Sequence, residues 1–154
     1  MDQNKLNFIQ NELPLLLNNL PPDRRAKWGK MNAQQMVEHL IDFFKVSSKK
    51  INFSLVTPVE HLQKFKEFLL SNKEFRENTK APMLPDEPFA LRHTSMQNAI
   101  QELQEEIDSF ISFFQNSDTA TATQHPVFGD LNFDEWVLLH YKHVVHHTKQ
   151  FGLV

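Results

Sequence analysis

The chain has 154 residues, the length of one domain, and we expect a single domain over residues 1–154. Its net charge of −3 and its scattered lysines and arginines predict no nucleic-acid partner, and it has no apolar run near the ~20 residues of a membrane span. It contains no cysteine, which excludes disulfides and a thiol nucleophile of its own, and residues 1–10 resemble no targeting peptide, so we expect a cytoplasmic protein.

The N-terminal segment is predicted to be helical. Leucine and isoleucine recur at helical spacing over residues 6–20, and a proline pair ends this first helix. Pro14 either kinks the helix or marks a late start. Residues 21–31 form a connector in which we expect Trp28 and the glycine after it to anchor the loop on the end of a bundle.

A second helix is predicted from a capping box of Asn32 and Gln35 to about Ser47. Its apolar face carries methionine, leucine and phenylalanine, and His39 lies at the edge of that face. A single histidine in such a place is more often a core residue bonded to a carbonyl than a ligand.

A third helix is predicted to start at Thr57, as the cap, with Glu60 completing a capping box, and to end between residues 72 and 75. His61 falls in its first turn among solvated residues, so we expect it on the surface. Residues 76–93 hold three prolines and form a long loop, and loops of this length often act as lids.

A fourth helix is predicted from Thr94, with Gln97 as its box partner, and His93 just before it has no obvious partner. Its apolar stripe is the cleanest in the chain, and we interpret the opposite face as solvated. That face consists of Gln101, Glu102, Glu105 and Glu106. Residues 116–131 read as a turn region in which Gly129 takes a turn conformation.

The last helix, predicted over residues 132–151 with a capping box of Asn132 and Glu135, holds four of the eight histidines. Four of the five predicted helices are long and strongly patterned, which favours an all-α fold, a four-helix bundle with one accessory helix. At about 100° per residue, one face of the last helix is mostly imidazole. That face carries Trp136, His140, His143, His147 and Gln150.

Burying several imidazoles without partners costs free energy, so these rings either face a wet cleft or bind something, and a divalent metal is the economical partner. His143 and His147, at i and i+4, can present two ring nitrogens to one ion. The zincin motif is absent, because Val144 stands where a zincin has its glutamate base. Catalytic zinc usually takes three protein ligands, so the third must come from another helix. His39 is the candidate there, and His140 is a rival on the same face.

Two segments resemble the signatures of DinB/YfiT-like proteins. WGKMNAQQMVEHL (28–40) is similar to the first signature, a tryptophan followed by a histidine in a helix. KHVVHHTKQF (142–151) is similar to the second, although Lys142 and Lys149 replace the asparagine and glycine usual there. HPVFGDLNFDEW (125–136) before the histidine-rich helix resembles one uncharacterised branch of that clan.

The resemblance implies a four-helix bundle, often dimeric, with a divalent metal held by His39, His143 and His147. Zinc or nickel is the expected ion, and a homodimer is the expected assembly. We expect His146 beside the site or on the surface. His125, before a proline, either holds a loop over the site or caps the turn, and we favour the turn.

The resemblance also implies two reactions at an open metal position. One is hydrolysis of a small-molecule substrate, and the other is S-transfer with a low-molecular-weight thiol cosubstrate such as bacillithiol or mycothiol. His140 is the candidate catalytic base, and Glu38, expected to be exposed, is a weaker one. The alternative is a non-enzymatic stress-response or binding bundle in which the metal site is structural or vestigial.

Overall fold

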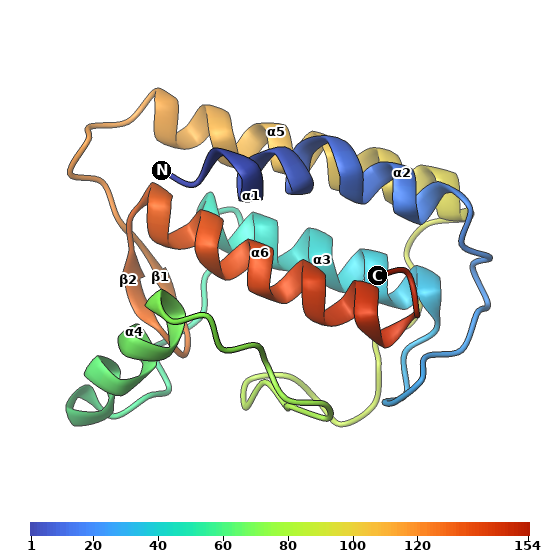
Figure 1. Cartoon of the computed structure of the whole chain (residues 1–154), viewed down its shortest axis with the longest axis horizontal. Coiled ribbons are helices and arrows are strands. Elements are labelled where there is room, and N and C mark those ends of the chain that lie inside the picture. Colours follow the sequence, from blue (N-terminus) through green and yellow to red (C-terminus); the bar gives the residue numbers. More distant parts are fainter.

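The computed structural model describes residues 1–154 and is mostly helical (Figure 1). In chain order the elements are α1 (Gln3–Asn7), a π-helical turn (Phe8–Glu12), α2 (Leu13–Asn18), α3 (Ala33–Ser47), a 3-10 turn (Val59–His61), α4 (Leu62–Leu70), α5 (Met96–Gln115), β1 (Thr123–His125), β2 (Gly129–Leu131) and α6 (Phe133–Gln150). The all-α prediction is confirmed, and one small two-stranded sheet is added to it. No helix combines the length and apolarity needed to cross a bilayer.

Four helical columns close around one core. The interrupted N-terminal column of α1, the π-helical turn and α2 contacts both α5 and α6, and α3 also contacts α5 and α6. The buried hydrophobic side chains form one continuous cluster between them. α4 lies at one end of this bundle near the β-hairpin and is the accessory helix (Figure 1).

The N-terminal column begins earlier than its leucine pattern indicates, because the Asp2 carboxylate accepts a hydrogen bond from the Lys5 amide and caps α1. Pro14 lies in the first turn of α2, directly after the π-helical turn. A proline lacks the amide hydrogen that an α-helix interior uses, and the wider turn before it accommodates that loss. The late start expected at Pro14 therefore holds for α2 alone, because helical structure already begins at Gln3.

The two helices that carry the candidate site start where the sequence predicts. Asn32 and Gln35 form a complete capping box at the start of α3, and Asn132 and Glu135 form one at the start of α6. Each cap fixes where the first turn begins, so the histidines further along each helix have defined heights and directions.

The predicted start of the third helix is wrong. The Thr57 hydroxyl donates to the Val127 carbonyl at 2.7 Å rather than capping a helix, and the chain first makes a 3-10 turn before α4. α4 also ends at Leu70, earlier than expected. The tertiary bond to the hairpin competes with the local cap and wins.

The start of the fourth helix is displaced by one residue, because Ser95, not Thr94, caps α5 by accepting from the Asn98 amide. The expectation of a fully solvated acidic face fails at Glu106, which is only 8% exposed. Its carboxylate lies 2.8 Å from the Lys50 ammonium, and that ion pair allows the burial.

The region predicted as turns contains the β-hairpin. β1 and β2 are antiparallel, with Thr123 opposite Leu131, and Gly129 has the positive φ of 78° expected of a turn glycine. The Thr123 hydroxyl donates to the Ser47 carbonyl at 2.8 Å and accepts from Trp136 Nε1 at 2.7 Å. The hairpin is thereby tied to the end of α3 and the first turns of α6.

Candidate metal centre

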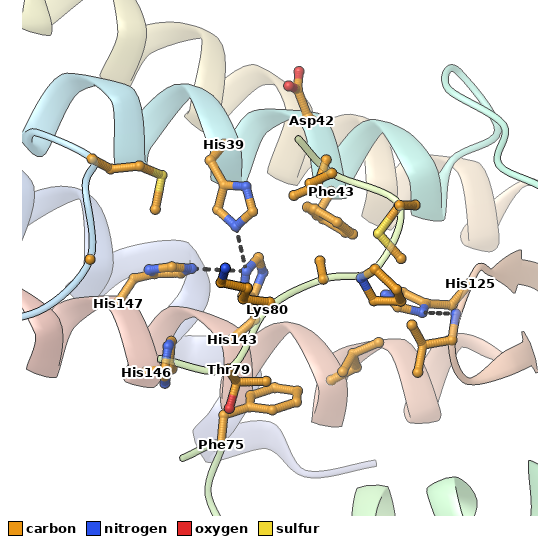
Figure 2. A pocket seen from close by; sticks show the side chains of 18 of the residues that line it. His39, Asp42, Phe43, Phe75, Thr79, Lys80, His125, His143, His146 and His147 are labelled. Carbon is orange, nitrogen blue, oxygen red and sulfur yellow. Dashed lines mark hydrogen bonds between the residues drawn. The ribbon is translucent and has the colours of Figure 1, made fainter. Parts of the chain in front are cut away.

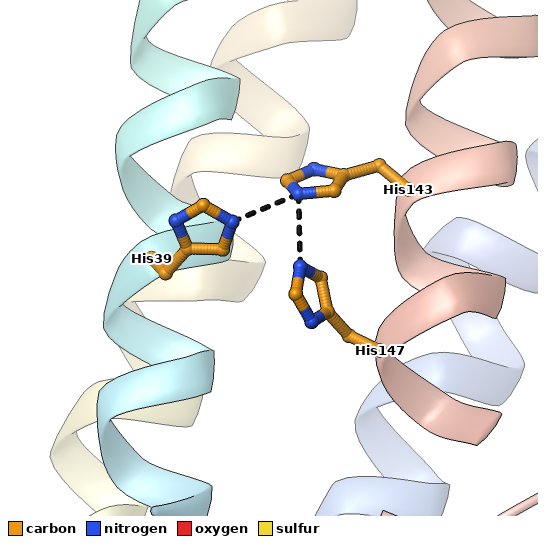
Figure 3. Close-up of side chains that lie close together, drawn as sticks. All are labelled: His39, His143 and His147. Carbon is orange, nitrogen blue, oxygen red and sulfur yellow. Dashed lines mark hydrogen bonds between the residues drawn. The ribbon is translucent and has the colours of Figure 1, made fainter. Parts of the chain in front are cut away.

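Three histidines from two neighbouring helices converge on one point (Figure 3). His39 projects from α3, and His143 and His147 project from α6. His143 Nε2 lies 2.9 Å from His39 Nε2 and 3.0 Å from His147 Nε2. The ligand nitrogens of all three lie within 4.8 Å of one another. We call these residues the three-histidine cluster.

The cluster is held in its neutral form. Burial, reinforced by a neighbouring imidazole, lowers the pKa of His39 to about 4. Burial first, and then the nearby imidazoles, lower the pKa values of His143 and His147 well below the usual 6.5. At neutral pH the three rings are therefore uncharged, which is the form that binds a metal ion.

A short relay fixes which nitrogen of His147 carries the hydrogen. Gln150 Nε2 donates to the Trp28 carbonyl at 2.8 Å, so the other amide atom, Oε1, faces His147 Nδ1 at 2.7 Å. An amide oxygen can only accept, so Nδ1 carries the hydrogen and Nε2 keeps its lone pair. Metal-binding histidines are commonly oriented this way. The sequence placed Gln150 on this face without indicating the relay.

The connector reaches this relay because of a glycine. Gly29 has φ of 82°, and a Cβ there would lie 3.0 Å from Gln150 Nε2. A side chain is disfavoured on both counts. The Lys27 amide also donates to the Gln150 carbonyl at 2.8 Å, so the expected anchoring of the Trp28 loop on the bundle end is confirmed.

The donor set fits a divalent cation. A neutral ring nitrogen carries either one hydrogen or one lone pair, so His143 Nε2 can donate to only one of its two neighbours. A cation between the rings would accept a lone pair from each. Zinc–nitrogen bonds of about 2.0–2.1 Å place tetrahedral ligands about 3.3 Å apart, a few tenths of an ångström more than the distances from His143 Nε2 to the other two Nε2 atoms.

His140, the rival ligand, lies apart from the cluster. The Ser47 hydroxyl donates to the Phe44 carbonyl at 2.7 Å and lies 3.0 Å from His140 Nε2, from which it accepts. The imidazole also stacks on Phe44 with ring centres 3.9 Å apart. The sequence pattern placed His140 on the correct face of α6, but its nitrogen Nε2 is engaged in the core.

The other histidines divide into three environments. His146 is half-buried beside the cluster, edge-on to His147 with ring centres 5.0 Å apart, as expected. His61 is exposed, also as expected. His93 does have a partner, because its Nε2 lies 2.5 Å from the Glu102 carboxylate on α5. The contact joins the end of the 76–93 loop to the second turn of α5, and helical spacing alone does not reveal it.

Glu38 is buried, contrary to expectation. Its two carboxylate oxygens accept from the Arg92 amide at 2.6 Å and from Gln34 Nε2 at 3.1 Å. The Arg92 guanidinium in turn lies 2.9 Å from the Asp42 carboxylate. These contacts fasten the end of the 76–93 loop onto α3 at the residue before His39 and at Asp42, three residues after it.

The cluster lies on the wall of a cleft of about 1950 Å³ (Figure 2). α3, α6, the hairpin and the 76–93 loop contribute to its lining, which is rich in aromatic and aliphatic side chains. Each carboxylate on this lining has a cationic partner. The pairs are Glu38 and Asp42 with Arg92, Glu74 with Lys149, Asp86 with Lys80, and Glu87 with Lys30.

The fold and site define a helical bundle whose three convergent imidazoles, on the wall of a cleft, could hold a metal ion. The DinB superfamily matches residues 5–151, and the chain belongs to this superfamily. Comparison with curated proteins and with solved structures gives no match. The resemblance of the two sequence signatures is thus confirmed over nearly the whole chain.

Proposed function

We propose that this protein is a divalent-metal-dependent S-transferase that joins a low-molecular-weight thiol to a small, largely apolar electrophile. One observation supports this most strongly. Three neutral imidazoles converge at a cleft with mainly apolar walls, and all three line that cleft. Such a donor set leaves the charge of an ion uncompensated and at least one position free for a ligand from the cleft.

A divalent ion held there supplies a Lewis acid that lowers the pKa of a thiol or water molecule bound to it. The chain supplies the rest. The Gln150 relay keeps the His147 lone pair directed at the ion, and the aromatic wall of the cleft excludes water from the bound thiol. The chain has no cysteine, so the thiol must come from a cosubstrate.

The surroundings favour a thiol over water as the nucleophile. Each carboxylate lining the cleft is paired with a lysine or arginine, and His140 Nε2 is bonded to Ser47, so neither these carboxylates nor His140 is free to act as the general base that water requires. A thiol, with an unperturbed pKa of about 8.5, needs far less help to lose its proton than water does.

The test is a comparison of two reactions on protein reconstituted with zinc or nickel. One is conjugation of cysteine or bacillithiol with 1-chloro-2,4-dinitrobenzene, in which a carbon–sulfur bond forms as chloride leaves. The other is hydrolysis of 4-nitrophenyl acetate. We expect metal-dependent conjugation in the parent protein and its loss in His39→Ala. Metal-dependent ester hydrolysis without conjugation would point to the hydrolase instead, and metal binding with neither activity would favour the non-enzymatic alternative.

A further inference from the structure

His125, at the end of β1, contributes a second polar group to the cleft. Its side chain lines the cleft and is only 7% exposed (Figure 2). The Phe43 ring lies between it and the three-histidine cluster, with centres 5.8 Å from His125 and 5.2 Å from His143. About one aromatic ring therefore separates His125 from the candidate metal position.

The tautomer of His125 is set by the hairpin. Its Nδ1 accepts hydrogen bonds from the Val127 amide at 2.9 Å and from the Phe128 amide at 3.2 Å. This confirms that His125 caps the turn. Since Nδ1 accepts twice, the ring hydrogen must be on Nε2, and the hydrogen bonds of His125 within the protein are the two at Nδ1. Trp28 Nε1 is the one fully buried side-chain donor without a partner, so His125 Nε2 is not sealed in the core, and its hydrogen is free to bond a ligand in the cleft that the side chain lines.

The donor is uncharged. Burial alone lowers the pKa of His125 to about 3, with no contribution from a charged group. Its ring neighbours are Phe43, Phe128 and Trp136. A carboxylate brought to this position would lose its hydration without gaining a counter-charge, whereas a carbonyl oxygen gains a hydrogen bond at a smaller cost.

We propose that His125 determines specificity by donating its Nε2 hydrogen to an uncharged carbonyl oxygen of a ligand whose other end binds at the three-histidine cluster. The apolar atoms between the two ends pack on Phe43. The ligand class is thus a small carbonyl compound with an apolar middle, and its carbonyl lies about one ring from its metal-binding atom. This inference rests on the proposed metal centre, and it adds the substrate class.

Two variants with complementary defects isolate the donor. His125→Asn retains a side-chain oxygen that can accept from the turn amides, and asparagine before Pro126 favours such a turn. Its side chain is too short to donate a hydrogen bond to a ligand in the cleft. His125→Phe retains the aromatic packing on Phe43 but has no N–H. Neither change touches the cluster, so both variants should bind zinc as the parent protein does.

The probes are two matched thiols, 4-acetylbenzenethiol and 4-isopropylbenzenethiol, titrated into the zinc-loaded protein by calorimetry. Both can bind zinc through sulfur, but only the first has a carbonyl oxygen. Comparing the ratio of their Kd values between proteins removes the difference in thiol acidity. We expect the preference for the acetyl compound to fall by about tenfold in both variants, the size of one hydrogen bond. Nitrogen-15 spectra should also show the His125 Nε2 hydrogen moving downfield when the acetyl compound binds.

The outcomes distinguish the role of His125 from the proposed metal centre. An unchanged ratio in both variants, with zinc and both thiols bound, overturns the role of His125 and leaves the metal centre intact. A parent protein that binds no zinc overturns the metal centre, and the two-point ligand with it. Loss of the acetyl preference in only one variant attributes the effect to packing or to the turn, and also overturns the donor role.

Discussion

Replacing Gln150 should weaken metal binding or preserve it, depending on what replaces it. In Gln150→Leu the buried His147 Nδ1 hydrogen and the Trp28 carbonyl both lose their partner. His147 is then no longer held in the tautomer that presents its Nε2 lone pair. Loss of such a supporting contact typically weakens metal binding by about 10- to 100-fold, equivalent to about 1.4–2.7 kcal/mol.

Gln150→Glu should have a different signature. A carboxylate still accepts from His147 Nδ1 and makes the ring more basic, so zinc affinity should equal or exceed that of the parent protein. The same carboxylate faces the Trp28 carbonyl without a hydrogen to donate, so the metal-free variant should unfold at a lower urea concentration. A residue that merely packs would give no such divergence between affinity and stability.

The assay is competition for zinc against a chromophoric chelator at about pH 7. Lys149→Ala is the matched control, because Lys149 is adjacent in the chain but exposed and paired with Glu74 on the surface. It should bind zinc as the parent protein does. If Gln150→Leu keeps its affinity within about twofold, or if the Leu and Glu variants weaken equally, the relay has no role in orienting His147.

Three further results are expected. Burial lowers the pKa of His39 to about 4, so between about pH 6.5 and pH 4 the unfolded chain binds more protons than the folded chain. The metal-free protein should therefore become less stable to urea as the pH falls through this range, and His39→Phe should lose less stability. Arg92→Ala should weaken the contacts between the 76–93 loop and Glu38, so thermolysin, which does not cleave at arginine, should cut the loop faster. An unchanged rate of cleavage would show that these contacts do not hold the loop. Sedimentation equilibrium at micromolar concentration should give a homodimer, and a monomer there would contradict that prediction.

Local sequence was sufficient for the helices that carry the site. Capping boxes at Asn32 and Asn132 set where α3 and α6 begin, and helical spacing then determines the faces of the histidines further along. The i, i+4 relation of His143 and His147 follows directly from this. The coarse architecture follows too, because strongly amphipathic helices of this length must bury their stripes against one another.

What the sequence could not predict is where tertiary contacts override or supplement local signals. Thr57 has the pattern of a helix cap, yet its hydroxyl donates to the carbonyl of Val127, 70 residues further along the chain. Glu38 is expected to be exposed, but the backbone of Arg92, which lies 54 residues further along the chain, covers it. His140 shares the face of the cluster, and only the position of Ser47 on α3 shows that it bonds elsewhere.

The most direct test of the account is the zinc content of gel-filtered protein after reconstitution, measured by elemental analysis in the parent protein and in His39→Ala, His143→Ala and His147→Ala. Circular dichroism of each variant checks that the bundle remains folded. The three-histidine cluster predicts about one ion per chain in the parent protein and almost none in each folded variant. Full zinc content in any one of the folded variants, or none in the parent protein, would contradict a metal centre built from these three residues.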